Sequence, residues 1–201
     1  MPTVAREERA LLADLLAEVG PDQPTLCAGW TTRDLAAHVV LRERRPLAAL
    51  GIAIGPLAGY TRHVQADVAR TPWPELVDTL RHPSPLLVGP TDKVINTTEL
   101  FVHHEDVRRA RAGWQPRPAD ARREATMWRF LRQRASYLFR DGSGGLRLEL
   151  PDGRAHVVRR GEPVTTLRGP ATELVLYGYG RRDHARVEVA APDEPADGPK
   201  G

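Results

Sequence analysis

Cysteine is almost absent from this sequence, because Cys27 is the only one among 201 residues. A single cysteine excludes an internal disulfide framework and a zinc site built from cysteines alone. No apolar run approaches the roughly 20 residues that a membrane-spanning helix needs. The first ten residues, MPTVAREERA, carry charges where a signal peptide has its apolar stretch. We therefore expect a cytoplasmic protein with no membrane partner.

Lysine and aromatic residues are also scarce. Lysine occurs only at Lys93 and Lys200, so 27 of the 29 basic residues are arginine. The 26 acidic residues balance most of this charge and leave a net charge of +3. Aromatic residues make up 5% of the chain and do not alternate with basic ones, as they do in surfaces that bind single-stranded nucleic acid. A nucleic-acid-associated factor, suggested by the arginines of 117–140, is therefore the least favoured hypothesis.

The first two thirds of the chain contain apolar stripes at helical spacing, separated by proline and glycine. They predict helices at 3–19, 34–55 with a kink or restart at Pro46, 59–70, 74–81, 91–112 and 119–140. Thr31 or Thr32 is expected to cap the second helix, with Asp34 in its first turn. Residues 1–140 are therefore predicted to form a bundle of about four main helices.

The composition changes at Asp141. GLRLEL and RAHVV alternate apolar and polar residues around Asp152-Gly153, which predicts a hairpin. VTTLRG, PATELVLYGYG and HARVEVA predict a further strand, a helix and a closing strand. Residues 141–190 are thus predicted to form a small α+β domain, and 191–201 a disordered tail. The expected fold class is mainly α, with a helical bundle followed by this small C-terminal domain.

The segment NTTELFVHHEDVRRA, residues 96–110, offers the strongest chemical pattern. Glu99 and His103 are four residues apart and share one helix face, together with apolar Val102. Burying a carboxylate and an imidazole there is costly unless something compensates, and a divalent metal ion does so. The spacing supports an ordinary hydrogen bond between the two side chains at least equally well.

The neighbours of this pair carry weaker expectations. Four of them are expected at the edge of the helix or in solvent: His104, Glu105, Arg108 and Arg109. Asp106 either accepts a hydrogen bond that orients His103 or pairs with an arginine. Cys27 precedes a helix start, where a thiolate is favoured, but no base is evident near it in the sequence, so a packed small residue is the preferred interpretation.

His38 lies near the middle of the second predicted helix. Taken alone, it is more typical of a satisfied core histidine than of a metal ligand. If this helix packs beside the helix at 91–112, however, His38 meets Glu99 and His103. Two histidines and one carboxylate with open positions are the arrangement of a catalytic rather than a structural metal site.

A resemblance to a known family supports this arrangement. The pattern G-W-T-x-x-D-L-x-x-H at 29–38, together with E-x-x-x-H at 99–103, resembles the DinB and mycothiol-dependent maleylpyruvate isomerase superfamily, in particular its actinobacterial metal-binding members. The stretch GPATELVLYGYGR, residues 169–181, resembles a motif of the small C-terminal domain in this group. The resemblance implies a DinB-like four-helix bundle whose His38, Glu99 and His103 hold a divalent metal, with zinc as the first choice and nickel or iron as alternatives.

The same resemblance implies a metal-dependent isomerase or S-transferase that uses mycothiol on a small electrophilic substrate. Arg42 and Arg45 flank the His38 helix, where guanidinium groups could bind carboxylates. We assign Arg42 to the catalytic site and Arg45 to the thiol cofactor, with a surface role for each as the alternative. The rival hypothesis is a non-enzymatic protein that binds a metal or small ligand. The expected partners are a small-molecule substrate and a low-molecular-weight thiol, and a homodimer stays open.

Overall fold

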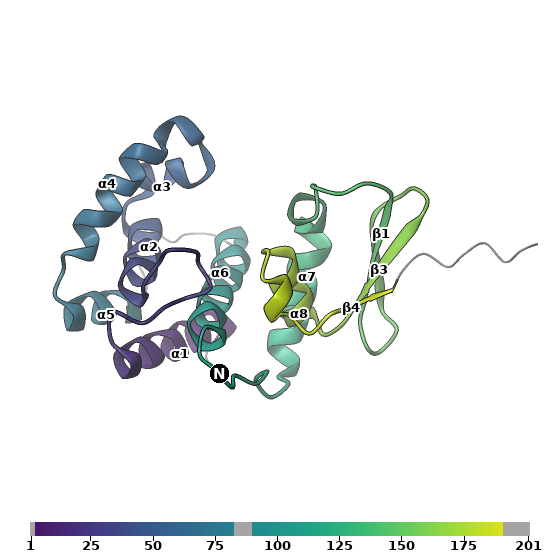
Figure 1. Cartoon of the computed structure of the whole chain (residues 1–201), viewed down its shortest axis with the longest axis horizontal. Helices are drawn as coiled ribbons and strands as arrows, with labels where there is room; N and C mark the ends of the chain where they lie inside the picture. The colour runs from purple at the N-terminus through teal and green to yellow at the C-terminus, as the bar shows by residue number, and fades with distance from the viewer. Residues whose placement is uncertain (1–2, 83–89, 191–201) are drawn as a thin grey trace, which may run out of the picture. The chain divides into compact units, whose positions relative to one another are not determined.

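The computed structural model describes residues 3–82 and 90–190, with the backbone alone for Ala53 and residues 90–95. The chain divides into two compact units, residues 1–117 and 118–201. The regular elements described in the first unit are helices (Figure 1). They are α1 (Val4–Val19), α2 (Thr32–Arg44), α3 (Pro46–Ala53), the 3-10 turn η1 (Gly55–Leu57), α4 (Ala58–Ala69), α5 (Trp73–Arg81) and α6 (Pro90–Arg109).

Capping residues fix where the first two helices begin. The Thr3 side chain accepts a hydrogen bond from the backbone of Arg6 at the start of α1. At α2, Thr31 and Asp34 form a capping box, in which the Asp34 carboxylate accepts from the Thr31 backbone at 2.9 Å. The predicted cap is confirmed, and so is the restart at Pro46, where α3 follows α2. The fixed start places His38 near the middle of α2.

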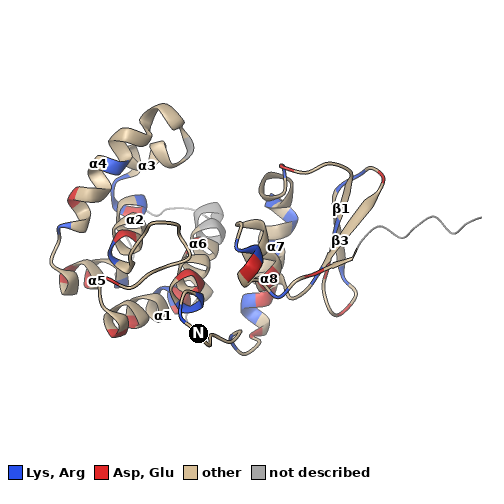
Figure 2. Cartoon of the chain, in the orientation of Figure 1, with Lys and Arg blue, Asp and Glu red and all other residues tan. Residues whose placement is uncertain are grey.

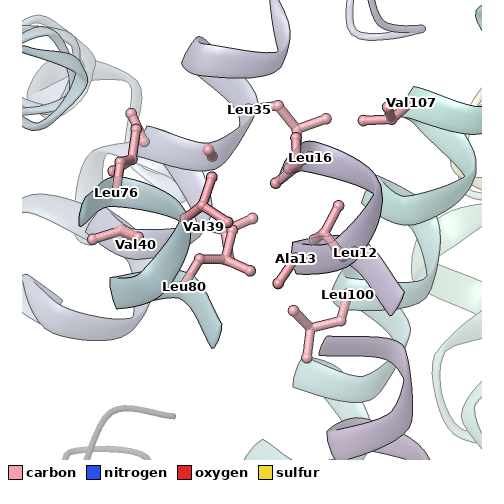
Figure 3. Close-up of a cluster of buried hydrophobic side chains, with 13 residues drawn as sticks. Leu12, Ala13, Leu16, Leu35, Val39, Val40, Leu76, Leu80, Leu100 and Val107 are labelled. Atoms are coloured by element: carbon pink, nitrogen blue, oxygen red, sulfur yellow. The ribbon is translucent and has the colours of Figure 1, made fainter. Parts of the chain in front are cut away.

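Four helices of the first unit, α1, α2, α5 and α6, share one apolar core (Figure 3). Its members include Leu12 and Leu16 of α1, Leu35 and Val39 of α2, Leu76 and Leu80 of α5, and Leu100 and Val107 of α6. Each fully buried leucine contributes about 1.5–3 kcal/mol relative to an exposed one. Because α2 and α6 both pack around this core, the core fixes the relative position of the two helices that carry the predicted metal ligands.

Helix α3 packs closely on α4 because Gly51 has no side chain. A Cβ atom at this position would overlap the Thr61 hydroxyl and the Leu57 carbonyl. The Thr61 hydroxyl donates to the carbonyl of Ala48 and closes the contact. This pairing holds α4 beside α2, on the side where His38 lies.

The second unit combines helices α7 (Ala121–Leu138) and α8 (Ala171–Gly178) and the 3-10 turn η2 (Arg182–His184) with a four-stranded sheet. The strands are β1 (Gly145–Glu149), β2 (Ala155–Arg159), β3 (Val164–Arg168) and β4 (Glu188–Ala190), in the order β2-β1-β3-β4. β1 and β3 are parallel, whereas β2 and β4 are antiparallel to their neighbours. The predicted hairpin, closing strand and helix are present, and the mainly α fold class with a small α+β unit is confirmed.

Helix α7 belongs to the second unit, although the sequence analysis placed it in the bundle of residues 1–140. Its buried face, including Phe130 and Leu131, packs with α8, and the rings of Phe130 and Tyr179 stack at 6.2 Å. The division therefore falls at 117/118 rather than at 140/141. The apolar stripe of α7 was read correctly as a buried face, but its partners are the later elements.

The tail predicted as disordered, 191–201, lies outside the described residues, as do residues 83–89 of the predicted loop before α6. Among the helices of the described ranges, none combines the length and apolar composition that a membrane span requires.

Candidate metal centre

Helices α2 and α6 bring His38, Glu99 and His103 together. One nitrogen of each histidine and one carboxylate oxygen lie within 4.8 Å of one another. The two imidazole rings meet edge to face with centroids 5.3 Å apart, and Nε2 of His103 lies 3.6 Å from the Glu99 carboxylate. The convergence predicted from two distant segments is therefore present in the fold.

The two histidines of this group are buried, and one of their ring nitrogens has no hydrogen-bond partner among the described residues. His38 and His103 are 8% and 7% exposed. Within the described part of the chain, Nε2 of His103 finds no hydrogen-bond partner. A buried nitrogen without a partner costs free energy, and a cation shared with the carboxylate and the second imidazole removes that cost. The donor set and this orphaned atom fit a divalent metal ion.

Asp106 fixes the orientation of His103. Its Oδ2 atom lies 3.1 Å from Nδ1 of His103, and the carboxylate is fully buried. A carboxylate at Nδ1 favours the tautomer with the proton on that nitrogen, which leaves the lone pair of Nε2 toward Glu99. Of the two roles considered for Asp106 in the sequence analysis, this geometry supports the orienting one.

Burial also keeps the His38 ring in its neutral form. Burial, and secondarily the neighbouring His103, lowers the pKa of His38 to about 4. The Glu99 carboxylate and the side chain of Gln65 oppose this shift without cancelling it. The Trp30 ring packs against the imidazole at 5.0 Å. At neutral pH the ring is therefore uncharged, and one nitrogen has a free lone pair.

Cys27 lies on the other side of His103 from this group. Its Sγ atom is 3.2 Å from Oδ2 of Asp106, so the two form a hydrogen bond. Cys27, Asp106 and His103 also place one ligand atom each within 4.8 Å of one another. The base that the sequence did not reveal near Cys27 is this carboxylate, 79 positions away. Only a tertiary contact could have shown it.

The two predicted arginines have different surroundings. Arg42 donates to the side-chain oxygen of Asn96 at 2.8 Å and lies 3.9 Å from the Glu99 carboxylate, so it borders the candidate metal centre. Arg45 is exposed and lines a surface cavity of about 580 Å³ beside α3 and α4. No contact among the described residues joins Arg45 to His38, Glu99 or His103.

The expectation that His104, Glu105 and Arg109 face solvent is wrong. They are 4%, 1% and 3% exposed. Glu105 forms ion pairs with Arg109 and, at 2.7 Å, with Arg117. Arg108, the fourth residue of that set, is half-buried and pairs with Glu105 at 3.0 Å.

Glu8 of α1 completes this buried ionic cluster. It lies 2.9 Å from Arg117 and 3.6 Å from Nδ1 of His104. Burial on its own would raise the pKa of Glu8, but the neighbouring His104 ring and the charge of Arg117 outweigh it and hold the pKa below its usual value. The face predicted to be solvated is thus buried because its charges find partners on distant segments.

Helices α1, α2 and α6 carry both signs of charge, whereas α7 has five arginines and one acidic residue, Glu124 (Figure 2). The nucleic-acid hypothesis stays an untested alternative.

No protein-family model matches the chain, and no curated protein sequence does. Among solved structures, a crystal structure of the mycothiol-dependent maleylpyruvate isomerase matches with a TM-score of 0.60 at 18% identity, over 96% of this chain and 92% of that one. A histidine-to-alanine mutant of that isomerase matches with a TM-score of 0.56 at 16% identity over the same shares. The chain therefore has the DinB-like fold of the mycothiol-dependent maleylpyruvate isomerase, in agreement with the resemblance of its sequence motifs.

Proposed function

We propose that this protein binds one divalent metal ion through His38, Glu99 and His103 and carries out thiol-dependent chemistry on a small electrophilic substrate. The observation that carries the proposal is the convergence of three ligand atoms within 4.8 Å around a buried Nε2 of His103 that has no hydrogen-bond partner in the described residues. The reaction class is isomerisation or S-transfer. The fold shared with a mycothiol-dependent isomerase supports the choice of thiol chemistry.

Two imidazoles and one carboxylate suit zinc, with nickel or iron as alternatives. Three protein ligands leave coordination positions open to small molecules, as in catalytic zinc sites. A divalent ion held there supplies Lewis acidity, which lowers the pKa of a coordinated thiol or water.

The remaining residues of the site bind and orient. Arg42 presents a guanidinium beside Glu99 and is itself held by Asn96, so it can bind a carboxylate of the substrate. Asp106 holds the Nδ1 proton of His103 and thereby keeps Nε2 free. Arg45, exposed at the end of α2, is proposed to contact an acidic or hydroxyl group of mycothiol.

Metal analysis of the purified full-length protein tests the ligand assignment. We expect one metal ion per chain in the wild type and its loss in His38→Ala, Glu99→Ala and His103→Ala. His63→Ala is the matched control, because its side chain is 75% exposed on α4. Full metal occupancy in the His103→Ala protein would contradict the assignment.

Calorimetric titration tests the thiol. Metal-loaded wild type is expected to bind mycothiol, and Arg45→Ala is expected to bind it more weakly. If the loaded protein gives no heat with mycothiol, either alone or with candidate electrophiles, the thiol-dependent part of the proposal is wrong while the metal site stands.

A second candidate is a non-enzymatic metal-binding protein. It is favoured by Cys27 and Asp106, which place a thiol and a carboxylate on the far side of His103. X-ray absorption at the metal edge separates the two candidates. A sphere closed by a fourth protein ligand supports binding without catalysis, and so does a sphere that contains the Cys27 sulfur, which would place the ion with Asp106 on the Nδ1 side of His103. A sphere with water beside His38, Glu99 and His103 supports the enzyme.

A further inference from the structure

The second unit contains a cavity that the proposed function does not use. Its volume is about 510 Å³, which is within the range of sites that bind small molecules. Helices α7 and α8 lie on one face of the sheet (Figure 1), and the cavity is lined by the C-terminal ends of both helices and by residues of all four strands. Every lining residue belongs to the second unit, so the cavity is complete within one compact part of the chain.

Positive charge exceeds negative charge in the lining of this cavity. Three arginines line it, Arg140, Arg159 and Arg182, against one carboxylate, that of Asp141. The Asp141 carboxylate is 85% exposed and lies 3.7 Å from Arg140. Arg182 forms no ion pair within the described part of the chain, and its guanidinium lies over the ring of Tyr177 at 5.3 Å. The cavity therefore favours an anion over a cation.

Arg159 is held firmly without being neutralised. Its guanidinium donates to three backbone carbonyls, those of Gly144 at 2.6 Å, Phe139 at 2.9 Å and Ser143 at 3.4 Å. Gly142 makes room for it, since a Cβ atom there would lie 2.9 Å from its Nη2 atom. A guanidinium has five N–H donors, so two of them have no partner among the described residues. A fixed cation with spare donors suits a carboxylate or a phosphate.

Aromatic rings lie beside these arginines. Tyr137 and Tyr177 both line the cavity, and the guanidinium of Arg140 lies 4.7 Å from the ring centroid of Tyr137. The Tyr137 residue is 66% exposed at the end of α7, so most of it is open to a ligand. Because aromatic faces pack well against other planar rings, these side chains favour a ligand that contains a ring.

We propose that this cavity binds an aromatic anion, a small molecule in which a planar ring bears a carboxylate or a phosphate group. Arg159 binds the charged group, with Arg182 as a second source of positive charge. The ring packs against Tyr137 or Tyr177. Both head groups match the planar fork of guanidinium N–H groups. This ligand site is separate from the proposed metal-binding function and does not depend on it.

NMR titration of metal-free, full-length protein tests the site with phenyl phosphate and with benzoate. Benzyl alcohol supplies the ring without the charge, and inorganic phosphate supplies the charge without the ring. We expect at least one aromatic anion to shift the amide signals of 137–146 and 177–189, and to bind more tightly than both comparison ligands. The head group that binds more tightly identifies the natural ligand as a carboxylate or a phosphate.

Three variants test the residues. Arg159→Met should weaken binding of the aromatic anion by about 10–100-fold, because it removes charged hydrogen bonds. Arg182→Met, at an exposed position, should weaken it less and keeps the test valid if Arg159→Met does not fold. Arg160→Met is the matched control, since Arg160 is exposed and does not line the cavity, and it should keep the affinity of the wild type.

Four results would overturn the inference. They are no shift with either aromatic anion, equal affinity for inorganic phosphate, unchanged affinity in the folded arginine variants of the cavity, and shifts confined to α2 and α6. The second result would leave only a general attraction of anions, and the fourth would place the anion at the candidate metal centre. A failure of metal binding does not affect this test, because the titrations use metal-free protein.

Discussion

Replacing Asp106 with alanine is expected to weaken metal binding without removing any proposed metal ligand. Asp106 is fully buried and accepts two hydrogen bonds at Oδ2, from Nδ1 of His103 at 3.1 Å and from Cys27 at 3.2 Å. Without the carboxylate, the His103 ring can carry its proton on either nitrogen. When Nε2 carries the proton, it offers no lone pair to a metal ion.

The size of the effect follows from the partners that Asp106 loses. Removing a carboxylate that orients a ligating histidine costs about 10–100-fold in metal affinity, which corresponds to about 1.4–2.8 kcal/mol. The buried N–H left without an acceptor costs a further ~1–3 kcal/mol of stability in the metal-free protein. Asp106→Asn keeps a side-chain oxygen that can accept a hydrogen bond from Nδ1 of His103, so this variant should lose less metal affinity and less stability than Asp106→Ala.

Zinc competition with a chelator of known affinity measures the first effect, and urea unfolding of metal-free protein measures the second. The matched control is Asp67→Ala, because Asp67 is a half-exposed aspartate on α4 that pairs with Arg70. Wild-type zinc affinity in Asp106→Ala would refute the orienting role. Equal losses in the control would show that a general change of charge, rather than the His103 contact, governs the affinity.

Three further predictions concern buried charges and close helix packing in the first unit. Arg9 and Glu43 form a buried ion pair, so Glu43→Ala should lower the free energy of unfolding by about 3–5 kcal/mol, because it leaves the arginine charge buried without its partner. The double variant Arg9→Met, Glu43→Leu should recover most of that lost stability, and urea titrations measure both. Folding lowers the pKa of Glu8. The carboxylate of Glu8 therefore contributes fully to the free energy of unfolding at pH values above the pKa range of an unfolded glutamate, and this contribution is lost as the pH falls through the pKa of Glu8 in the folded protein. Urea midpoints of Glu8→Gln should therefore change less on acidification than those of the wild type. Gly51→Ala should destabilise by about 1–3 kcal/mol through overpacking, but Gly59→Ala, whose Cβ meets nothing within 4 Å, should not lower the melting temperature.

The sequence predicted the helices from local spacing, whereas the three proposed ligands followed from spacing together with the resemblance to a known superfamily. Glu99 and His103 share a face at i,i+4, and the motif around His38 resembles that of a known superfamily. The contact between Cys27 and Asp106, in contrast, joins residues 79 positions apart and follows only from the packing of the fold, which periodicity does not reveal.

The burial of Glu105 and Arg109 could not be predicted for the same physical reason. A charged stripe on a helix is usually solvated, because burying its charges costs free energy unless residues on other segments pair with them. Here Arg117 supplies a partner for Glu105 and also pairs with Glu8, which lies 109 positions away from it. The stripe of α7 likewise predicted a buried face but could not identify its partner, which is why that helix was assigned to the wrong unit.

The ion pairs of Arg117 with Glu8 and Glu105 have a consequence for synthesis on the ribosome. Helix α1 packs against α6, and Arg117 joins both at the end of the first unit. The face of α1 that packs on α6 therefore stays uncovered until α6 has been translated, which is about half of the protein. His38 is translated well before Glu99 and His103, so the proposed metal site is complete only once α6 has been made.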